Sequence, residues 1–271
     1  MHMYELITKS TARIDSYKGD QHIGSGTGFF CHLARKGDLA IIGLVTNKHV
    51  VAGADKVKML LTVKKGGSIE HFKAEVPLNT FSAIYHTDKQ VDACAINISQ
   101  VMGQLQAQGY ELQHAVVNKD IIATEELFKQ ILPLEEITMI GYPIGIMDAH
   151  NNGAVARRGV IASNPADNYE GRPEFLIDMS CMPGSSGSPV YLANTGGYST
   201  REGSVIMGNR LHLLGFLWGG PERKVTGEIV ALPAPMNLIP VPVTQIPINL
   251  GFVIKATQLK DIFDQAAQML G

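Results

Sequence analysis

The feature that most constrains the fold is a series of short apolar runs, each about four to eight residues long, separated by Gly, Asn, Asp and Pro. The runs are rich in β-branched and aromatic residues, the types that favour strands. The clearest runs are residues 39–46, 57–63, 91–98, 137–140, 211–218 and 250–254. Many short strands joined by glycine-containing turns predict an all-β fold, either a sandwich or a barrel.

Two segments have the apolar spacing of a helix. Residues 121–131 predict a short helix with an acidic first turn, and residues 257–270 predict a longer one. In the second segment the apolar positions are Leu259, Ile262, Phe263 and Ala266. Residues 231–247 contain five prolines, which a central strand excludes, so we expect an extended surface loop there.

Charge and cysteine content limit the partners and the compartment. The net charge of −2 gives no sign of a nucleic-acid partner or of an anionic membrane surface, and no apolar run is long enough to span a membrane. Cys31, Cys94 and Cys181 match no metal-ligand spacing, and we expect them to be reduced and at least partly buried. We therefore expect a cytoplasmic protein, with secretion left open if a signal segment has been removed.

The strongest chemical signal is the segment 183–190, with the sequence PGSSGSPV. Gly184 and Gly187 flank Ser186 and permit a tight turn that exposes its Oγ as a nucleophile. In such a turn the backbone N–H groups of Gly184 and Ser186 can point together at a developing oxyanion. Taken alone, the segment could also be a Gly/Ser loop without chemistry.

Two further residues could complete a nucleophile–base system. His49 lies between an apolar strand and the apolar pair Val50-Val51, and a general base must be held in such a fixed place. Asp92 opens an apolar run and needs a hydrogen-bonding partner if it is buried, which a histidine N–H supplies. Taken singly, His49 could be a structural histidine and Asp92 an aspartate of a turn.

The three residues occur in the order His49, Asp92, Ser186, which is the order of chymotrypsin-like proteases and not of subtilisins or α/β-hydrolases. Four segments carry a wider resemblance: GSGTGF at 24–29, TNKHVV at 46–51, DACAI at 92–96 and GSSGSP at 184–189. Together they resemble the bacterial trypsin-like peptidases, a group that includes the glutamyl endopeptidases and the high-temperature-requirement proteases. The resemblance runs from about Gly24 to about Phe263.

The resemblance implies a fold for nearly the whole chain. We expect a single peptidase domain with two six-stranded antiparallel β-barrels of the chymotrypsin-like kind. The first barrel would take about residues 1–125 and the second about residues 126–256. A C-terminal helix would follow within residues 257–271.

The resemblance also implies a mechanism, that of a serine endopeptidase acting on a peptide or protein substrate. Ser186 would attack the peptide carbonyl to form an acyl-enzyme, His49 would transfer the proton, and Asp92 would orient His49. The backbone N–H groups of Gly184 and Ser186 would form the oxyanion hole. No cofactor and no metal are expected.

The implied substrate site lies on either side of Ser186 in the chain. Ser180 would form the base of the primary specificity pocket, and a late strand would pair with the substrate backbone. The residues of that strand are Leu217, Trp218, Gly219 and Gly220. Glutamyl endopeptidases carry a histidine where Leu217 stands, so we expect a small or medium apolar residue before the scissile bond. Asp178 is a weaker candidate for the recognition of a basic residue.

Two other functions fit the same motifs. The chain could be a non-catalytic peptide-binding module on a protease fold, or a highly restricted processing protease with one partner protein. The oligomeric state is left open. Outside the motifs, Arg157 and Arg158 are expected to form a solvated pair beside a turn. The remaining histidines singled out as structural are His71, His86, His114 and His212.

Overall fold

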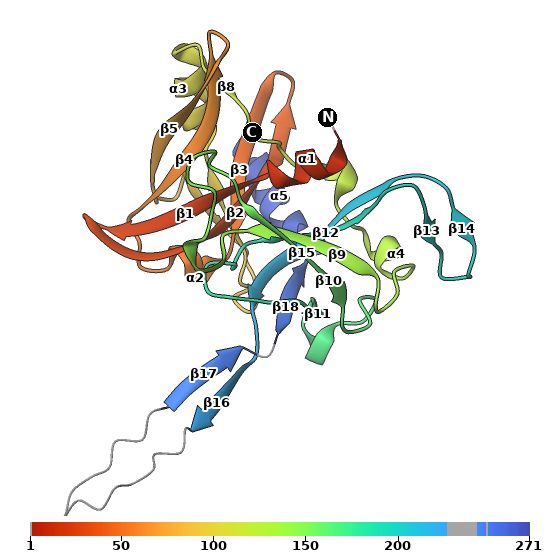
Figure 1. Cartoon of the computed structure of the whole chain (residues 1–271). Helices are drawn as coiled ribbons and strands as arrows, with labels where there is room; N and C mark the ends of the chain where they lie inside the picture. Colours follow the sequence, from red (N-terminus) through yellow and green to blue (C-terminus); the bar gives the residue numbers. More distant parts are fainter. Residues whose placement is uncertain (1, 227–242, 248) are drawn as a thin grey trace, which may run out of the picture.

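The computed structural model describes residues 2–226, 243–247 and 249–271, and it has two β-rich halves with the C-terminal helix packed against both (Figure 1). The helices are α1 (Met3–Thr8), α2 (Lys48–Val51), α3 (Ser99–Ala107), α4 (Glu125–Phe128) and α5 (Leu259–Gln268). The short helix predicted within 121–131 is confirmed as α4, where Thr124 Oγ1 accepts a hydrogen bond from the Leu127 N–H at 3.3 Å.

The first half is an eight-stranded antiparallel sheet. Its strands are β1 (Thr11–Lys18), β2 (Gln21–Lys36), β3 (Leu39–Thr46), β4 (Lys56–Lys65), β5 (Ser68–Pro77), β6 (Ala83–Tyr85), β7 (Cys94–Asn97) and β8 (Glu111–Leu112). The hydrogen-bonded order is β5-β4-β1-β2-β3-β7-β6, and β8 pairs with β4. Alternate residues of β4 are buried, so one face of the strand packs into the core of this half.

The second half is a closed barrel of six antiparallel strands in the order β10-β11-β18-β15-β12-β9. The strands are β9 (Glu136–Gly141), β10 (Val155–Ile161), β11 (Glu174–Asp178), β12 (Pro189–Asn194), β15 (Arg210–Gly219) and β18 (Leu250–Lys255). Gly215 allows β15 and β18 to approach closely, because a Cβ there would lie 2.0 Å from the Ile254 carbonyl oxygen.

The all-β class is confirmed, and so is the six-stranded barrel of the second half. The expected barrel of the first half is not confirmed, because eight strands rather than six form its sheet and the order has two ends, at β5 and β6. The strand at one of those ends, β6, has only three residues and pairs with β7. So short a strand offers few backbone groups with which to close a ring.

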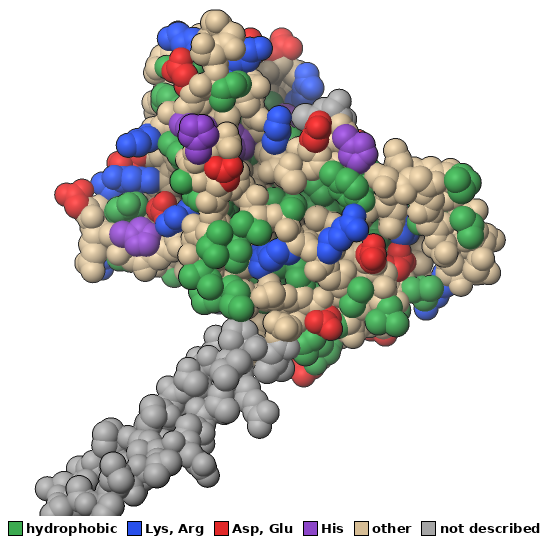
Figure 2. Space-filling view, viewed as in Figure 1, with side chains coloured by type: hydrophobic (Ala, Val, Ile, Leu, Met, Phe, Trp, Pro, Cys, Tyr) green, Lys and Arg blue, Asp and Glu red, His purple; other side chains and the backbone are tan. Residues whose placement is uncertain are grey.

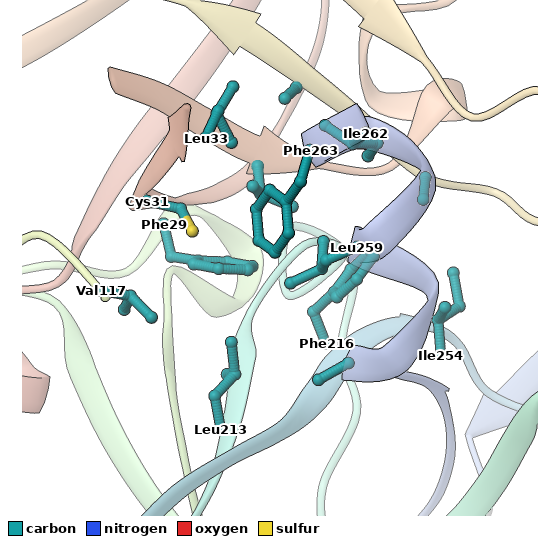
Figure 3. Close-up of a cluster of buried hydrophobic side chains, with 14 of the residues drawn as sticks. Phe29, Cys31, Leu33, Val117, Leu213, Phe216, Ile254, Leu259, Ile262 and Phe263 are labelled. Carbon is teal, nitrogen blue, oxygen red and sulfur yellow. The ribbon is translucent and has the colours of Figure 1, made fainter. Parts of the chain in front are cut away.

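Helix α5 covers the core that the two halves share (Figure 3). Its Leu259, Ile262 and Phe263 are buried against side chains of both halves. The partners drawn from the strands include Phe29, Cys31 and Leu33 of β2, Leu213 and Phe216 of β15, and Ile254 of β18. The predicted C-terminal helix is therefore confirmed, with a 3-10 turn at Ala256–Gln258 before its first residue.

Two small hairpins extend from the second half. One pairs β13 (Tyr198–Ser199) with β14 (Val205–Ile206), and the other pairs β16 (Glu222–Thr226) with β17 (Val243–Pro247) and projects away from the body (Figure 1). The prediction of a loop over 231–247 is wrong at its end, where β17 forms a strand. Proline is tolerated there because β17 belongs to a two-stranded ribbon rather than to the middle of a sheet. Residues 231–242 of that prediction lie outside the described residues.

Charged side chains are mixed on the face of the molecule shown in Figure 2, where Lys and Arg alternate with Asp and Glu and no large patch of one sign is seen. Among the described residues, none of the helices has the length and hydropathy needed to cross a membrane. All three cysteines are buried and unpaired, as expected from the sequence.

Candidate active site

His49 lies in α2, a single helical turn that directly follows β3. The residue between them, Asn47, is fully buried and donates a hydrogen bond from its side chain to the Asp92 carbonyl oxygen at 2.8 Å. Val50 and Val51 fix the turn from the other side, because both are buried in the core of the first half. The apolar pair that follows His49 in the sequence therefore anchors it at the strand end.

His49 and Asp92 are in direct contact. His49 Nδ1 lies 2.5 Å from Asp92 Oδ2, and the His49 backbone N–H donates to Asp92 Oδ1 at 3.1 Å. The Asp92 side chain is 25% exposed and the His49 side chain 48% exposed, so the imidazole faces the surface while the carboxylate lies behind it. With Nδ1 bound to a carboxylate, Nε2 is the ring nitrogen left for a reacting group.

The loop that leads to Asp92 is held from two elements. Lys48 Nζ of α2 donates to the Asp88 carbonyl oxygen at 2.8 Å. From α5, the Asp261 carboxylate accepts hydrogen bonds from the Thr87 N–H at 3.0 Å and from the Thr87 hydroxyl at 2.6 Å. The C-terminal helix thus fixes the path of this loop as well as covering the shared core.

Ser186 lies on a tight turn between β11 and β12. Gly184 and Gly187 on either side have φ of +87° and +86°, the left-handed region that glycine adopts without strain. Within the turn the Ser185 N–H donates to the Met182 carbonyl oxygen at 3.0 Å. The Gly187 N–H donates to the Leu217 carbonyl oxygen at 2.7 Å, which ties the turn to β15. The glycine pattern of the sequence thus marks a real turn around Ser186.

Thr27 of β2 joins this turn to the first half. Its N–H donates to the Ser186 carbonyl oxygen at 2.8 Å, and its hydroxyl donates to the Gly184 carbonyl oxygen at 2.9 Å. The Thr27 carbonyl oxygen accepts the Thr46 hydroxyl at 2.7 Å and leaves no space for a Cβ on Gly187, which would lie 1.9 Å from it. Thr27 lies in the GSGTGF segment but was not predicted to be a site residue.

Gly26 brings the two parts of the site together. A Cβ at Gly26 would lie 2.7 Å from the Val50 side chain and 3.3 Å from the Ser186 carbonyl oxygen, so both approach this glycine. Val50 directly follows His49, and Ser186 therefore lies beside the α2 turn. The Ser186 hydroxyl donates to the Trp218 carbonyl oxygen at 3.4 Å, and no hydrogen bond joins it to His49 among the described residues. Such catalytic bonds are often long without substrate and tighten when it binds.

The peptide between Pro183 and Gly184 has a defined orientation. The Pro183 carbonyl oxygen accepts the Ile144 N–H at 2.6 Å. The peptide is trans, so the Gly184 N–H points to the opposite side, away from the segment that holds Ile144. Within the described part of the chain, neither the Gly184 N–H nor the Ser186 N–H donates to another residue. Both groups expected to form the oxyanion hole are thus free to donate.

The expected substrate-binding residues gather around the same turn. Leu217 is buried, and its N–H and carbonyl are bonded to Ser188 and Gly187, so its backbone is not free to pair with a substrate. Trp218 is half-buried and stacks on the Phe252 ring, with centroids 5.4 Å apart. Gly219 and Gly220 follow at the end of β15. Of the four residues expected to pair with a substrate backbone, Leu217 is therefore one whose backbone groups are already bonded within the protein.

Two apolar side chains pack together where the primary pocket was expected. A Cβ on Gly251 would lie 2.5 Å from Cys181 Sγ and 2.7 Å from the Leu217 side chain, so both side chains are packed against this glycine. Burial raises the pKa of the Cys181 thiol to about 11 and keeps it neutral. Ser180, expected at the pocket base, is half-buried, and Asp178 is exposed at the end of β11.

The expectation of a solvated Arg157-Arg158 pair is wrong for Arg157. Its guanidinium lies behind the Ser186 turn, where Nη1 donates to the Ser180 carbonyl oxygen at 2.6 Å and Nη2 donates to Ser185 Oγ at 3.0 Å. Residues 155–161 form β10, whose alternation places Arg157 on the same face as Gly159 and Ile161. That alternation is the signal that could have identified it.

No three His, Cys, Asp or Glu side chains of the described residues lie together in a way that could hold a metal ion. The polar groups of the site are the His49 imidazole with its Asp92 carboxylate, and the backbone N–H groups of the Ser186 turn. Such groups can move a proton and stabilise an oxyanion.

Comparison with known proteins places the chain in a family. The model of the trypsin-like peptidase domain matches residues 26–197, and no curated protein matches. The serine endoprotease from Yersinia pestis is 13% identical with a TM-score of 0.49, over 97% of this chain and 65% of that one. The Rv3671c protease from M. tuberculosis, in its active form, is 18% identical with a TM-score of 0.48, over 96% of this chain and 82% of that one. The chain spans less than two thirds of the length of the Yersinia protein. Because the family model covers more than half of it, this chain belongs to the family of trypsin-like peptidase domains.

Proposed function

We propose that this chain hydrolyses peptide bonds through an acyl-enzyme intermediate, with Ser186 as nucleophile, His49 as general base and Asp92 as its partner. The observation that carries the proposal is the bond of His49 Nδ1 to Asp92 Oδ2 at 2.5 Å, because it leaves His49 Nε2 for Ser186. The contacts of Gly26 with Val50 and with the Ser186 carbonyl oxygen support it, because they hold the nucleophile turn beside α2.

The first half of the reaction forms the acyl-enzyme. Ser186 Oγ turns from its long hydrogen bond with Trp218 and attacks the peptide carbonyl carbon while its proton passes to His49 Nε2. Asp92 stays ionised and stabilises the imidazolium. The C–N bond then breaks, His49 gives the proton to the leaving amine, and an ester of Ser186 remains. In the second half a water molecule attacks the ester carbonyl while its proton passes to His49 Nε2. The bond between the acyl carbon and Ser186 Oγ then breaks, and His49 returns the proton to Ser186 Oγ.

The negative charge of each tetrahedral intermediate would be held by the N–H groups of Gly184 and Ser186. Support comes from the Pro183 carbonyl, whose bond to Ile144 turns the Gly184 N–H to the other side of the peptide. Donors fixed in this way need no reorganisation when charge develops, and each contributes about 10²–10³-fold to kcat in proteases studied by mutation.

We further propose that the substrate backbone pairs with residues 218–220 and that the residue before the scissile bond is small or medium and apolar. The packing of Cys181 and Leu217 against Gly251 supports this preference, because these two side chains reduce the space beside Gly251 and neither is charged. Pocket contacts discriminate by only about 1–3 kcal/mol per methylene, so neighbouring apolar side chains should also be accepted.

An unbiased peptide-library cleavage profile tests the proposal. The wild-type chain should cleave after small or medium apolar residues, and the Ser186→Ala variant should cleave nothing while still binding the same peptides. Cleavage of only one or a few sequences would favour a restricted processing protease. Equal behaviour of wild type and Ser186→Ala on every peptide would contradict the enzymatic proposal and favour a peptide-binding module.

A further inference from the structure

Arg157 is a charged residue placed directly behind the nucleophile turn. Its Nη1 donates to the Ser180 carbonyl oxygen at 2.6 Å and its Nη2 to Ser185 Oγ at 3.0 Å. These two acceptors lie at the ends of the segment 180–185, and Ser185 directly precedes Ser186. One guanidinium thus bridges the segment that carries Gly184, one of the two proposed oxyanion donors.

The surroundings of this guanidinium are unusual for a structural arginine. Ser185 is fully buried, and burial lowers the pKa of Arg157. Among the described residues no carboxylate lies within salt-bridge distance of Arg157. The neighbouring Cys181 thiol is neutral, because its pKa is raised to about 11. A buried cation lowers the stability of the fold unless hydrogen bonds or a nearby negative charge compensate for its loss of water.

The segment that Arg157 bridges has no regular secondary structure. Four backbone groups of the segment are also hydrogen-bonded. The Ser185 N–H donates to Met182, and the carbonyls of Pro183, Gly184 and Ser185 accept from the Ile144 N–H, the Thr27 hydroxyl and the Ser188 N–H. Ser185 Oγ has Arg157 as its one hydrogen-bonding partner in the described part of the chain. Arg157 is thus the group that holds the Ser185 side chain, which lies between the peptides that carry the Gly184 and Ser186 N–H groups.

We infer that Arg157 is a positioning residue for the oxyanion hole. Its planar fork holds Ser180 and Ser185 together, and so it fixes the N–H groups of Gly184 and Ser186 in the direction of the reacting carbonyl. Its unpaired positive charge also favours the negative charge that develops there. Lysine cannot replace it fully, because a single ammonium lacks the fork that spans both acceptors. The inference rests on the proposed endopeptidase function of the same site.

Arg158 offers a matched control on the same strand. Its side chain is exposed on the opposite face of β10, where the guanidinium lies over the Tyr4 ring at 5.7 Å from the centroid. Substitution of Arg158 changes the net charge of the protein as much as substitution of Arg157. Comparison of the two variants therefore shows whether an effect on activity comes from the position of Arg157 or from the loss of one positive charge.

The test compares Arg157→Gln, Arg157→Lys, Ser185→Ala and Arg158→Gln. Each folded variant, checked by its thermal unfolding midpoint, is measured for kcat and KM on the best peptide from the cleavage profile and for its rate of inactivation by a fluorophosphonate. For Arg157→Gln we expect kcat and the inactivation rate to fall together by about 10²-fold with little change in KM. Arg157→Lys and Ser185→Ala should fall by about tenfold, and Arg158→Gln should match the wild type.

Two results would overturn the inference. One is an Arg157→Gln variant with the kcat and inactivation rate of Arg158→Gln. The other is an Arg157→Gln variant with unchanged kcat but a changed preference for the residue before the scissile bond, which would make Arg157 a pocket residue. If Arg157→Gln does not fold, the same measurements on Ser185→Ala decide: the kcat and inactivation rate of Arg158→Gln in that variant would overturn the inference. A wild-type chain that neither cleaves peptides nor reacts with the fluorophosphonate would contradict the proposed function itself.

Discussion

His49 Nδ1 and Asp92 Oδ2 lie 2.5 Å apart, and the second oxygen of the same carboxylate accepts the backbone N–H of His49. The two bonds fix both the position of the ring and the nitrogen that carries the proton. Because Asp92 sits on a loop that Lys48 and Asp261 hold from two elements, this relationship depends on α2 and α5 as well as on the strands.

The carboxylate of Asp92 can be tested by Asp92→Asn. The amide keeps the shape but favours the wrong tautomer of His49, so we expect kcat to fall by about 10⁴-fold, as for the same change in a related triad. Steady-state kinetics on a cleaved peptide measures it. Asp88→Asn is the control, because Asp88 lies in the same loop and, among the described residues, its side chain accepts a hydrogen bond from the Gln90 N–H alone, at 2.8 Å. Equal losses in both variants would mean that loop disruption, not the His49 partner, lowers kcat.

The close approach of Gly187 to Thr27 predicts a costly substitution. In Gly187→Ala the new Cβ would lie 1.9 Å from the Thr27 carbonyl oxygen at a φ of +86°. We expect the free energy of unfolding to fall by about 2–4 kcal/mol from strain and overpacking together, with loss of activity. Gly196→Ala has a similar φ of +82° and open space, so it should lose only about 1 kcal/mol. Denaturant unfolding of both variants compares them, and similar losses would contradict the contact with Thr27.

Much of this fold and site could be predicted from local pattern. Short β-branched runs indicated the strands of both halves, and the glycines around Ser186 indicated its turn, because each of these signals lies within a few neighbouring residues. The spacing of Leu259, Ile262 and Phe263 likewise indicated α5. These features depend on backbone preferences that the chain carries locally.

Other features depend on contacts between distant segments. Closure of a sheet depends on which edge strands meet, and the short β6 pairs only with β7 in the described order. The role of Arg157 depends on Ser180 and Ser185, which both lie in the irregular segment that follows the next strand, β11. The role of Thr27 depends on a turn in the other half of the chain. No local pattern carries these relationships.

The hydrogen bonds of His114 indicate that the free energy of unfolding falls in acid. Its Nε2 accepts the Thr62 N–H at 2.9 Å while Nδ1 lies 3.2 Å from the Lys9 carbonyl oxygen, an arrangement that fits only the neutral ring. Burial lowers the pKa of His114 from 6.5 to about 4. Between these values the unfolded chain binds the proton and the folded chain does not, so stability falls as the pH falls from about 6.5 to about 4. The expected loss is about 3 kcal/mol.

Unfolding at several pH values checks this expectation. His114→Gln should lower stability at pH 7, where the ring is well bonded, and should reduce the slope of stability against pH between about 4 and 6.5. His150→Gln changes an exposed side chain and should keep the wild-type slope. If His114→Gln also keeps the full slope, the acid sensitivity comes from other groups.

Helix α5 should contribute strongly to the stability of both halves. Leu259 is fully buried in the shared core, so Leu259→Ala should lower the free energy of unfolding by about 3 kcal/mol. Met269 lies just after α5 and is 40% exposed, so Met269→Ala should change it by less than about 0.5 kcal/mol. Denaturant unfolding followed by tryptophan fluorescence can compare them, because Trp218 lies in the second half. Equal effects would show that α5 does not hold the halves together.

The central claim is that Ser186 is the nucleophile of a His49–Asp92 system, and covalent labelling tests it most directly. The wild-type chain is treated with a fluorophosphonate and digested, and the modified peptide is identified by mass spectrometry. We predict one adduct, on Ser186, that is absent in Ser186→Ala and forms far more slowly in His49→Ala. An adduct on another residue, or labelling of Ser186→Ala as fast as the wild type, would contradict the claim.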